Sequence, residues 1–549
     1  WPNSTEQVLT ASYKGYRIAF SGEIYNKEDW MNIAGSNDVE RIINGFVSEG
    51  ARILNRMNGQ FILAIYDEEE KNLFLARDRF GIKSMYYTIQ GDELIFATDI
   101  PAILGELKDK PTANDAVIFD YLVFNRTDQT ENTFFTGIKK LMHGCYLTAD
   151  SLGIKVSKWY NLSQAVKDVY YSTNKEEYLK RFENAVQLRL QGDKPWGVCL
   201  SGGLDSSAVT STIIKRLNQK DVHSFSAVYG KGCKSDESKY IDQFADMVPN
   251  MHYVYPTADK LYDVLDKLIQ IQAEPTPTTS PFALYCVMEE VVKQGKQVTL
   301  DGQGSDEALA GYEYIPGLYY KTLFTHFRWF SFIKENIKYL KVHHSTRSLK
   351  YCLFFMLPAK MRMKARVAQR GYINPTFVER FHNSVIADKL YGANTMQEML
   401  INHFEYKLEH LLKWGDNNAN YFGLISRVPF LDHNIVEYSI ALEDKAKVHN
   451  GYTKYILREA MCGIMPEDVR KRVDKMGFSV PQDEWFREEK FQKLIMDILT
   501  SDSFRNRGYI IPEEAVALYQ RHLRGEVNVS KDIWKWINLE LWFRMFIDK

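Results

Sequence analysis

The sequence predicts a chain of two parts with different folds, an antiparallel strand-rich part followed by a parallel α/β part that ends in helices. Short apolar runs separated by turns fill the first 105 residues, which is typical of antiparallel sheets. From residue 173 onward strands alternate with helices, and this alternation predicts a parallel sheet covered on both faces. After residue 311 the apolar period is mostly helical. We place the junction of the two parts around residues 150–172.

The apolar runs of the N-terminal part mark its expected strands. They lie at residues 17–20, 61–66, 73–76, 85–87 and 94–97. The first is closed by Ser21-Gly22, and the second by Asp67 and an acidic turn. Runs at this spacing predict a largely antiparallel system of sheets.

The second part begins with a helical period over residues 178–188, followed by a strand at 197–200 and a helix from about Ser206. A strand at 223–228, a helix at 283–293 and a strand at 298–300 come next. Because ligands of open α/β sheets bind beyond the carboxyl ends of the strands, the residues after 200 and after 300 are the first candidates for a site.

The overall composition excludes several classes of protein. The 549 residues are 45% hydrophobic and 25% charged, which excludes a disordered or collagen-like chain. The 69 basic and 70 acidic residues nearly cancel, so no general affinity for polyanions is implied. No apolar run approaches 18 residues, and no membrane span is expected. Six scattered cysteines favour a reducing compartment, and we expect a cytoplasmic protein.

One segment departs strongly from this balance. Residues 321–370 hold twelve Lys and Arg against a single acid, Glu335, a net charge of +11, together with many aromatic residues. Two interpretations stay open. The segment is either a solvated helical insertion, about residues 320–395, whose aromatics lie in the core, or a surface for an anionic partner. That partner would be a phosphorylated substrate, an anionic lipid or a nucleic acid.

The heptapeptide at residues 201–207, Ser-Gly-Gly-Leu-Asp-Ser-Ser, lies between an expected strand and an expected helix. Its glycines let the backbone approach a ligand, and a helix N-terminus offers free N–H groups to an anion. Ser201 and Ser206 add hydroxyl donors. Asp205 would repel a bare phosphate, so we expect it to bind Mg²⁺ that bridges to phosphate. The alternative is an ordinary glycine-rich turn.

A second loop has the same character. Asp-Gly-Gln-Gly-Ser-Asp-Glu at residues 301–307 follows the expected strand at 298–300. The carboxyl ends of parallel strands meet at one edge, so Asp205 and Asp306 could hold one Mg²⁺ on a nucleotide. An ordinary acidic turn is the alternative.

These strings resemble a known family. Residues 201–207 are similar to the PP-loop signature of ATP pyrophosphatases, and together with other strings they resemble the glutamine-dependent asparagine synthetases. The other strings are Ser21–Asn26, Ala76–Lys83, Asp301–Glu307, Arg427–Asp432, Gly451–Lys454 and Lys475–Pro481. The resemblance covers almost the whole chain in the family's order, and the basic segment matches least.

The resemblance implies an α/β plus α+β architecture. Residues 1–165 would form a glutaminase-type αββα sandwich, incomplete as numbered, and residues 166–549 a PP-loop synthetase domain with a parallel sheet between helices. The first releases ammonia from glutamine. The second uses ATP and Mg²⁺ to adenylate a carboxylate, by default that of aspartate, which ammonia then converts to an amide. The implied partners are these small molecules, and a homodimer stays an open alternative.

The resemblance also implies roles for particular residues. Lys454 would stabilise charge on the phosphate, and Gln303 stands where many members carry a glutamate base. Asp205 and Asp306 would bind the metal. The implied glutamine-binding residues are Gly22, Glu23 and Asp38. The implied ATP-binding residues are Leu200, Ser201, Gly202, Gly203, Asp205, Ser206, Ala227, Asp301 and Gly302.

The sequence departs from the family at both sites. The family's N-terminal Cys nucleophile has no counterpart, since the first cysteine is Cys145, and we expect the numbering to start inside a longer protein. Ser21 replaces an oxyanion-hole Asn. Near the acceptor site Asn417, Asn420 and Ile425 replace charged or Met residues of the family.

These departures leave three functions open. The default is aspartate amidation, although we expect aspartate to be a poor acceptor because residues 274–280 offer no Arg to its α-carboxylate. The first alternative is amidation or ring closure on a sugar uronate, a peptide or another carboxylate. The second is a degenerate, non-catalytic binding protein.

Overall fold

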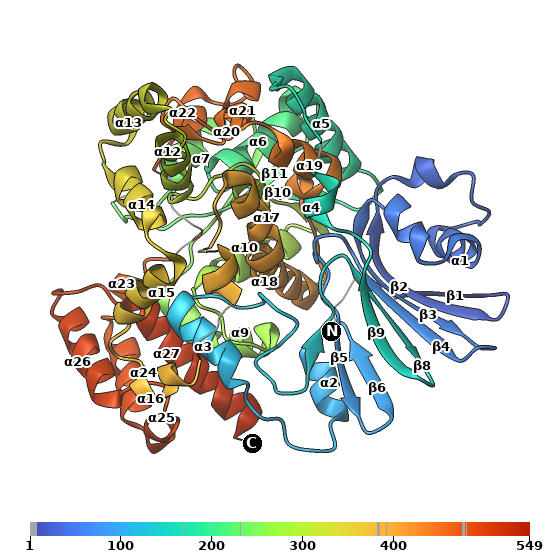
Figure 1. Ribbon diagram of the computed structural model, residues 1–549, viewed down its shortest axis with the longest axis horizontal. Helices are drawn as coiled ribbons and strands as arrows, with labels where there is room; N and C mark the ends of the chain where they lie inside the picture. The colour runs from blue at the N-terminus through green and yellow to red at the C-terminus, as the bar shows by residue number, and fades with distance from the viewer. Residues whose placement is uncertain are drawn as a thin grey trace.

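The computed structural model describes residues 8–167, 169–230, 232–381, 385–390, 392–474, 478 and 480–548. Figure 1 shows an N-terminal group of antiparallel strands beside a larger body of helices around a second sheet. The molecule is thus a mixed α/β protein with separate antiparallel and parallel sheets. The predicted change of fold class along the chain is confirmed.

The N-terminal part contains a six-stranded antiparallel sheet in the order β1-β2-β3-β4-β8-β9. Its strands are β1 (Leu9–Tyr13), β2 (Tyr16–Ile24), β3 (Gly59–Asp67), β4 (Asn72–Arg77), β8 (Cys145–Asp150) and β9 (Gly153–Lys158). Helix α1 (Asp38–Glu49) covers one face, where Ile42 and Ile43 pack with Phe20 and Phe61. Alternate strand residues therefore point to two different cores.

The other face of this sheet packs on a three-stranded sheet, β6-β5-β7. It consists of β5 (Tyr86–Gln90), β6 (Glu93–Ala97) and β7 (Lys139–Lys140), and helices α2 (Ile100–Glu106) and α3 (Asp115–Phe124) follow β6 along the chain. Leu75 and Leu147 of the larger sheet pack with Met85 and Tyr87 in a buried apolar core. Two sheets thus face each other, with α1 outside one of them.

Strand β2 corrects one prediction. We expected Ser21-Gly22 to close the strand, but the strand runs on to Ile24, with Ser21 opposite Ile62 and Gly22 opposite Phe61. Gly22 has φ 131°, and a Cβ there would lie 2.1 Å from the carbonyl oxygen of Gln60. The glycine therefore permits a close strand approach and does not form a turn.

The second part is built on a five-stranded parallel sheet in the order β12-β11-β10-β13-β14. Its strands are β10 (Trp196–Cys199), β11 (His223–Ala227), β12 (Asn250–Val254), β13 (Val298–Leu300) and β14 (Ile425–Arg427). Strand order reverses between β10 and β13, so the carboxyl ends of these two strands flank a topological switch point.

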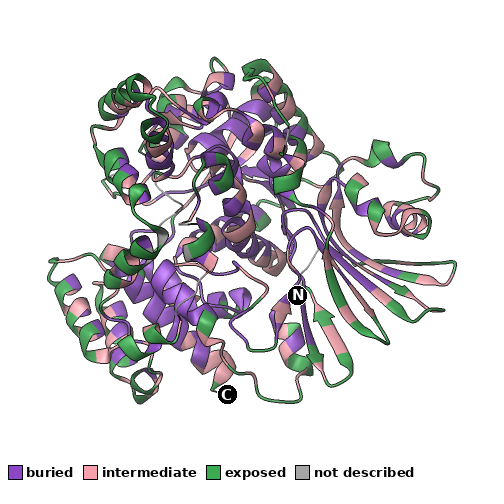
Figure 2. Ribbon diagram, in the orientation of Figure 1, coloured by how far each residue is buried: buried purple, intermediate pink, exposed green. Residues whose placement is uncertain are grey.

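Helices cover both faces of the parallel sheet, as predicted. On one face Val198 and Leu300 pack against α5 (Lys175–Leu188) and α6 (Leu204–Lys215). On the other face Phe225 packs against α10 (Ser280–Lys293) and α18 (Leu408–Phe422). In Figure 2 the inner helices and strands are mostly buried, whereas the outermost helices are largely exposed.

A third core joins the segment after β6 to the end of the chain. Phe119, Tyr121 and Phe124 of α3 share one buried cluster with Trp536 and Trp542 of α27 (Ser530–Trp542). Residues of the first 165 thus pack with the last helices. The division of the chain at residue 165 stays a prediction.

The residues after 311 are mostly helical, as the apolar period predicts. The basic segment forms the end of α12 (Ile315–Thr325), then α13 (Trp329–His343), α14 (Arg347–Met356) and α15 (Ala359–Ala368). Within the described part of the chain, none of the helices has the length and apolarity that crossing a bilayer requires.

Candidate functional site

The first glycine loop joins the end of β10 to the start of α6. Gly203 is the N-cap of the helix, and Gly202 has φ 67°, a conformation that glycine adopts without strain. The Ser206 hydroxyl lies 3.1 Å from both the backbone nitrogen and the hydroxyl of Ser201. The loop is therefore closed on itself by its own side chains, at a helix N-terminus suited to an anion.

The second loop begins at the end of β13 and touches the first. A Cβ on Gly302 would lie 2.8 Å from the backbone nitrogen of Ser206, so only glycine lets the loops meet. The Asp301 carboxylate accepts hydrogen bonds from the backbone N–H of Gln303 (3.0 Å) and the hydroxyl of Ser426 (2.8 Å). Burial raises the pKa of Asp301 above its usual range. Asp301 therefore holds the second loop in place.

Lys454 lies between the two predicted metal-binding carboxylates. Its Nζ is 2.6 Å from an oxygen of Asp205 and 2.7 Å from an oxygen of Asp306. Lys454 is buried, has φ 52° and precedes α21 (Tyr455–Ala460). Gly311 leaves it room, because a Cβ there would lie 2.2 Å from the Lys454 Cε. Three charged groups predicted from separate strings thus converge beside the two loops.

The remaining predicted ATP residues lie nearby along the same sheet edge. Leu200 follows β10 and donates its backbone N–H to the Phe225 carbonyl at 2.9 Å, and Ala227 ends β11. Both side chains are buried. Gln303 is half-buried in the second loop.

Two arginines at this site were not predicted. Arg472 donates to the carbonyl of Gly202 at 2.9 Å and pairs with Glu237 at 2.5 Å. Arg458 is almost fully buried. Burial lowers its pKa to about 10, although the negative charge of Asp205 acts to raise it. The only sequence signal was the basic run at residues 470–472. The string Lys475–Pro481 follows this run, and its residues 475–477 and 479 lie outside the described residues.

The predicted glutamine-binding residues occupy a different place. The Glu23 carboxylate makes a two-pronged ion pair with Arg427, with contacts of 2.6 and 2.7 Å. Burial would lower the pKa of Arg427, but its bonds to Glu23 raise it. Asp38, the first residue of α1, instead pairs with Lys27 at 2.9 Å. The structure thus pairs Glu23 with the last residue of β14 and pairs Asp38 with Lys27.

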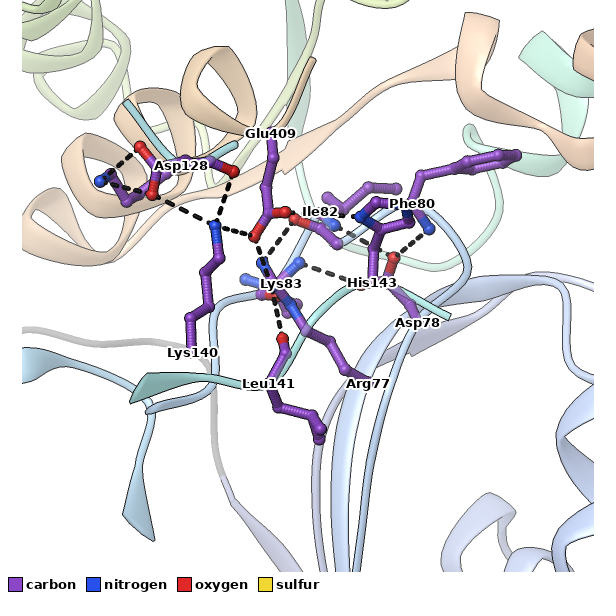
Figure 3. Close-up of polar contacts among 12 residues, drawn as sticks. Arg77, Asp78, Phe80, Ile82, Lys83, Asp128, Lys140, Leu141, His143 and Glu409 are labelled. Carbon is purple, nitrogen blue, oxygen red and sulfur yellow. Dashed lines mark hydrogen bonds and ion pairs between the residues drawn. The ribbon is translucent and has the colours of Figure 1, made fainter. Parts of the chain in front are cut away.

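A buried network of charges joins the two parts (Figure 3). Glu409 of α18 accepts from Arg77 at 2.5 Å and lies 2.9 Å from Lys140. His143 approaches its other oxygen at 3.4 Å. Burial alone would raise the pKa of Glu409, but these partners hold it well below its usual range. Lys83 extends the contact through Asp416 at 2.7 Å.

The predicted acceptor segment is engaged with its surroundings. Asn418 donates to the carbonyl of Pro281 at 2.9 Å and accepts from Gln272 at 3.2 Å. Glu274 pairs with Lys413 at 2.8 Å. Residues 272–281 and 413–418 therefore form one polar wall.

The fold and the site together define a class. A parallel sheet carries two glycine loops at its switch point, with a lysine and two carboxylates closing on them, and an antiparallel sandwich is fixed to it through buried ion pairs. This is the architecture of an α/β protein whose helix N-terminus at the switch point is suited to an anion, with a set of antiparallel sheets packed beside the parallel sheet.

Comparison with known families narrows the class. The asparagine synthase family profile matches residues 177–544, and the glutamine amidotransferase domain profile matches residues 2–160. The chain therefore belongs to the asparagine synthase family. It is an ATP-dependent, glutamine-hydrolysing, amide-forming ligase by class.

Individual relatives are distant. The chain is 25% identical over 490 residues to asparagine synthetase [glutamine-hydrolyzing] 3 of Bacillus subtilis, covering 85% of this chain and 76% of that protein. It is 29% identical over 418 residues to putative asparagine synthetase [glutamine-hydrolyzing] 2 of Methanocaldococcus jannaschii, covering 73% and 75%. It is also 24% identical over 561 residues to amidase chry2 of Gibberella zeae, covering 90% and 81%.

Proposed function

We propose that the loops at residues 201–206 and 301–306 bind ATP and that the enzyme adenylates a carboxylate there. A carboxylate becomes an electrophile when AMP is its leaving group, and the departing pyrophosphate needs positive charge and N–H donors. The observation that carries the proposal is the convergence of Lys454 on Asp205 and Asp306 beside the α6 N-terminus. Gln303 lies in the same loop and would face the acceptor.

The residues present fit a magnesium ion. Asp205 and Asp306 offer hard oxygen ligands, and both carboxylates already contact one cation, the ammonium of Lys454. Among the described residues no cluster of three or more His, Cys, Asp or Glu is arranged to hold a metal. Mg²⁺ typically takes one or two carboxylates and completes its shell with phosphate oxygens and water. When bound, it would neutralise the pyrophosphate that Lys454 and the loop N–H groups orient.

For the N-terminal part we propose a glutaminase of αββα type, with glutamine bound at Gly22, Glu23 and Asp38. The two facing sheets with α1 outside support the layering. Glu23 would recognise the α-ammonium of glutamine and would share its carboxylate with Arg427. All six cysteines are free thiols, which supports our inference of a cytoplasmic enzyme.

The default acceptor is aspartate, and a larger carboxylate is the alternative. The alternative is supported by the polar wall at residues 272–281 and 413–418, where Asn418 and Glu274 are already engaged. Because Lys413 is paired with Glu274, that lysine is not free to bind the α-carboxylate of aspartate. The match to a fungal protein named an amidase also supports a spread of acceptors in the family.

The experiment is pyrophosphate release from ATP with Mg²⁺, glutamine and a panel of carboxylates. Asp205→Asn should abolish release, because it removes a metal ligand without changing side-chain size. Asp246→Asn, an exposed surface position, is the control. Release by Asp205→Asn within about tenfold of wild type would contradict the metal role, since one lost electrostatic contact costs about 10²–10³-fold.

The same assay decides between the acceptors. Aspartate turnover with kcat/KM of about 10⁴ M⁻¹s⁻¹ or more, an ordinary enzyme value, would identify a plain asparagine synthetase. A uronate or peptide carboxylate that exceeds aspartate at least tenfold would establish the alternative. ATP binding without release by any acceptor would favour the degenerate binding protein.

A further inference from the structure

Helix α13 buries charge and exposes apolar side chains, the reverse of a normal surface helix. Its buried residues are Glu335, paired with His449 at 2.8 Å, and Tyr339. Its exposed residues include Phe330, which is 94% exposed, and Ile333, which is 54% exposed. Of the two interpretations of this segment, the one that places its aromatics in the core is therefore wrong for Phe327, Trp329 and Phe330, whose side chains are exposed.

The exposed apolar residues of α13 form one stripe. They are Trp329, Phe330, Ile333, Ile337 and Leu340. At 3.6 residues per turn these five positions fall within about 100° of arc. This stripe (the α13 apolar stripe) is as wide as the core-facing side of an ordinary amphipathic helix, yet solvent covers it.

Three lysines run along the edge of the α13 apolar stripe. Lys334, Lys338 and Lys341 are exposed and occupy the next arc of the helix, about 20–80° from Phe330. Across the described residues, none of the three has an acidic partner within ion-pair distance. The next helix repeats the pattern, with Leu353 65% exposed beside the exposed Lys350.

The location leaves this surface accessible and close to the active site. Figure 1 places α13 and α14 at the outer end of the molecule, away from the N-terminal sheets. The inner face of α13 holds the hairpin of β15 (Val448–His449) and β16 (Tyr452–Thr453), which leads into Lys454. His343 bonds to the carbonyl of Gly451 at 2.8 Å, and a Cβ on Gly451 would strike the backbone of Lys338 at 2.8 Å.

We propose that α13 and α14 dock this enzyme on a membrane surface rich in anionic phospholipids. An apolar stripe edged by lysines is the pattern of a helix that lies in the plane of the bilayer, with apolar side chains among the acyl chains and lysines at the phosphates. Anionic lipids are concentrated in the cytoplasmic leaflet. The docked helix would bring the hairpin of Lys454 close to carboxylates displayed at that surface.

Charge and polarity favour a bilayer over other partners. A second copy of the chain would set one +11 segment against another. A nucleic acid would use the lysines and could stack on Phe330, but it offers nothing to Ile333, Ile337 or Leu340. A bilayer is the partner that uses both halves of the pattern.

The test is sedimentation of the purified chain with vesicles of phosphatidylcholine, with or without phosphatidylglycerol. We expect binding only with phosphatidylglycerol, and binding that weakens with salt. The triple variant Lys334→Gln, Lys338→Gln, Lys341→Gln should bind about 100-fold more weakly, because each lysine contributes about fivefold. The double variant Phe330→Ser, Ile337→Ser should lose at least about tenfold.

Two control variants remove lysines or an exposed apolar side chain elsewhere on the molecule. Lys180→Gln, Lys215→Gln, Lys220→Gln removes three exposed lysines outside the segment, and Ile89→Ser removes an apolar residue that is 55% exposed. Both should bind like wild type. Pyrophosphate release and thermal unfolding should be unchanged in every variant, since none touches the ATP loops.

A second readout reports contact with acyl chains. Brominated phosphatidylglycerol vesicles should quench Trp329 fluorescence, measured as the difference from Trp329→Phe. The proposal is overturned if wild type fails to bind anionic vesicles at low salt or if the control variants lose as much as the α13 variants. It is also overturned if the double variant Phe330→Ser, Ile337→Ser abolishes a dimer but leaves vesicle binding intact. A third contrary result would be RNA that binds the chain as tightly as vesicles do and binds this double variant equally well.

Discussion

Replacing Glu409 by Gln tests whether the buried charge network holds the two parts of the chain together. The change keeps the shape of the side chain but removes the carboxylate that pairs with Arg77 and weakens the hold on Lys140. Arg77 is completely buried and Glu409 nearly so. Breaking one partner of a buried ion pair costs about 3–5 kcal/mol, because the other charge stays in the interior.

The loss translates into a melting temperature that depends on what unfolds. Entropies of unfolding of about 2.1 cal/mol/K per residue give a shift of roughly 3–4 °C if the whole chain unfolds as one unit. If the N-terminal part unfolds by itself, the same loss shifts its transition by roughly 10 °C. The melting-temperature shift in scanning calorimetry would therefore report both the loss of stability and whether the N-terminal part unfolds separately from the rest of the chain.

The matched control is Glu93→Gln. Glu93 pairs with Lys108 at 2.8 Å, but both side chains are more than half exposed, so solvent screens the pair and its loss should leave the melting temperature nearly unchanged. If Glu409→Gln costs no more than Glu93→Gln, the network does not stabilise the junction and the reasoning fails. Loss of glutamine-dependent release with ammonia-dependent release intact would show that the junction also couples the two sites.

Three further predictions concern single residues. Lys454→Ala should lower pyrophosphate release at least about 10²-fold with little change in the KM for ATP; a rise in KM alone would mean that the lysine only binds. Arg427→Lys keeps the charge but loses the two-pronged contact with Glu23, and should destabilise the chain by about 2 kcal/mol in urea unfolding. Burial would lower the pKa of His143, but Glu405 and Glu409 raise it above 6.5. His143 thus stabilises fully below pH 6.5 and loses that effect as pH rises through its raised pKa. The cost of His143→Gln in thermal unfolding should therefore be largest below pH 6.5 and should shrink as the pH rises through the raised pKa of His143; a cost independent of pH would contradict a protonated histidine.

The sequence was informative where local pattern and the geometry of the sheet act together. Strands at 197–200 and 298–300 follow from their alternation with helices, and the edge rule then predicts that Asp205 and Asp306 meet. Strand β14 was missed because Ile-Ser-Arg is too short to show a period. Arg472 was missed because its contact with Gly202 spans 270 residues of chain.

The junction between the two parts was invisible for the same reason. Arg77 and Glu409 are separated by 332 positions, and neither belongs to a pattern that marks it as buried. In the basic segment the charge was visible but the orientation of α13 was not, because apolar residues occupy two sides of that helix. Tyr339 lies on the inner side and Phe330 on the outer side.

The core shared by α3 and α27 constrains the order in which parts of the chain can fold during synthesis. Phe124 leaves the ribosome long before Trp542, by roughly 20–80 s at usual rates of translation. During that interval α27 is not available to pack against the apolar side chains of α3. Those side chains must therefore be covered by another part of the nascent chain or by a chaperone. Helix α3 therefore reaches its final packing only when the last helix docks, whereas the facing N-terminal sheets enclose cores to which α27 contributes none of the described residues.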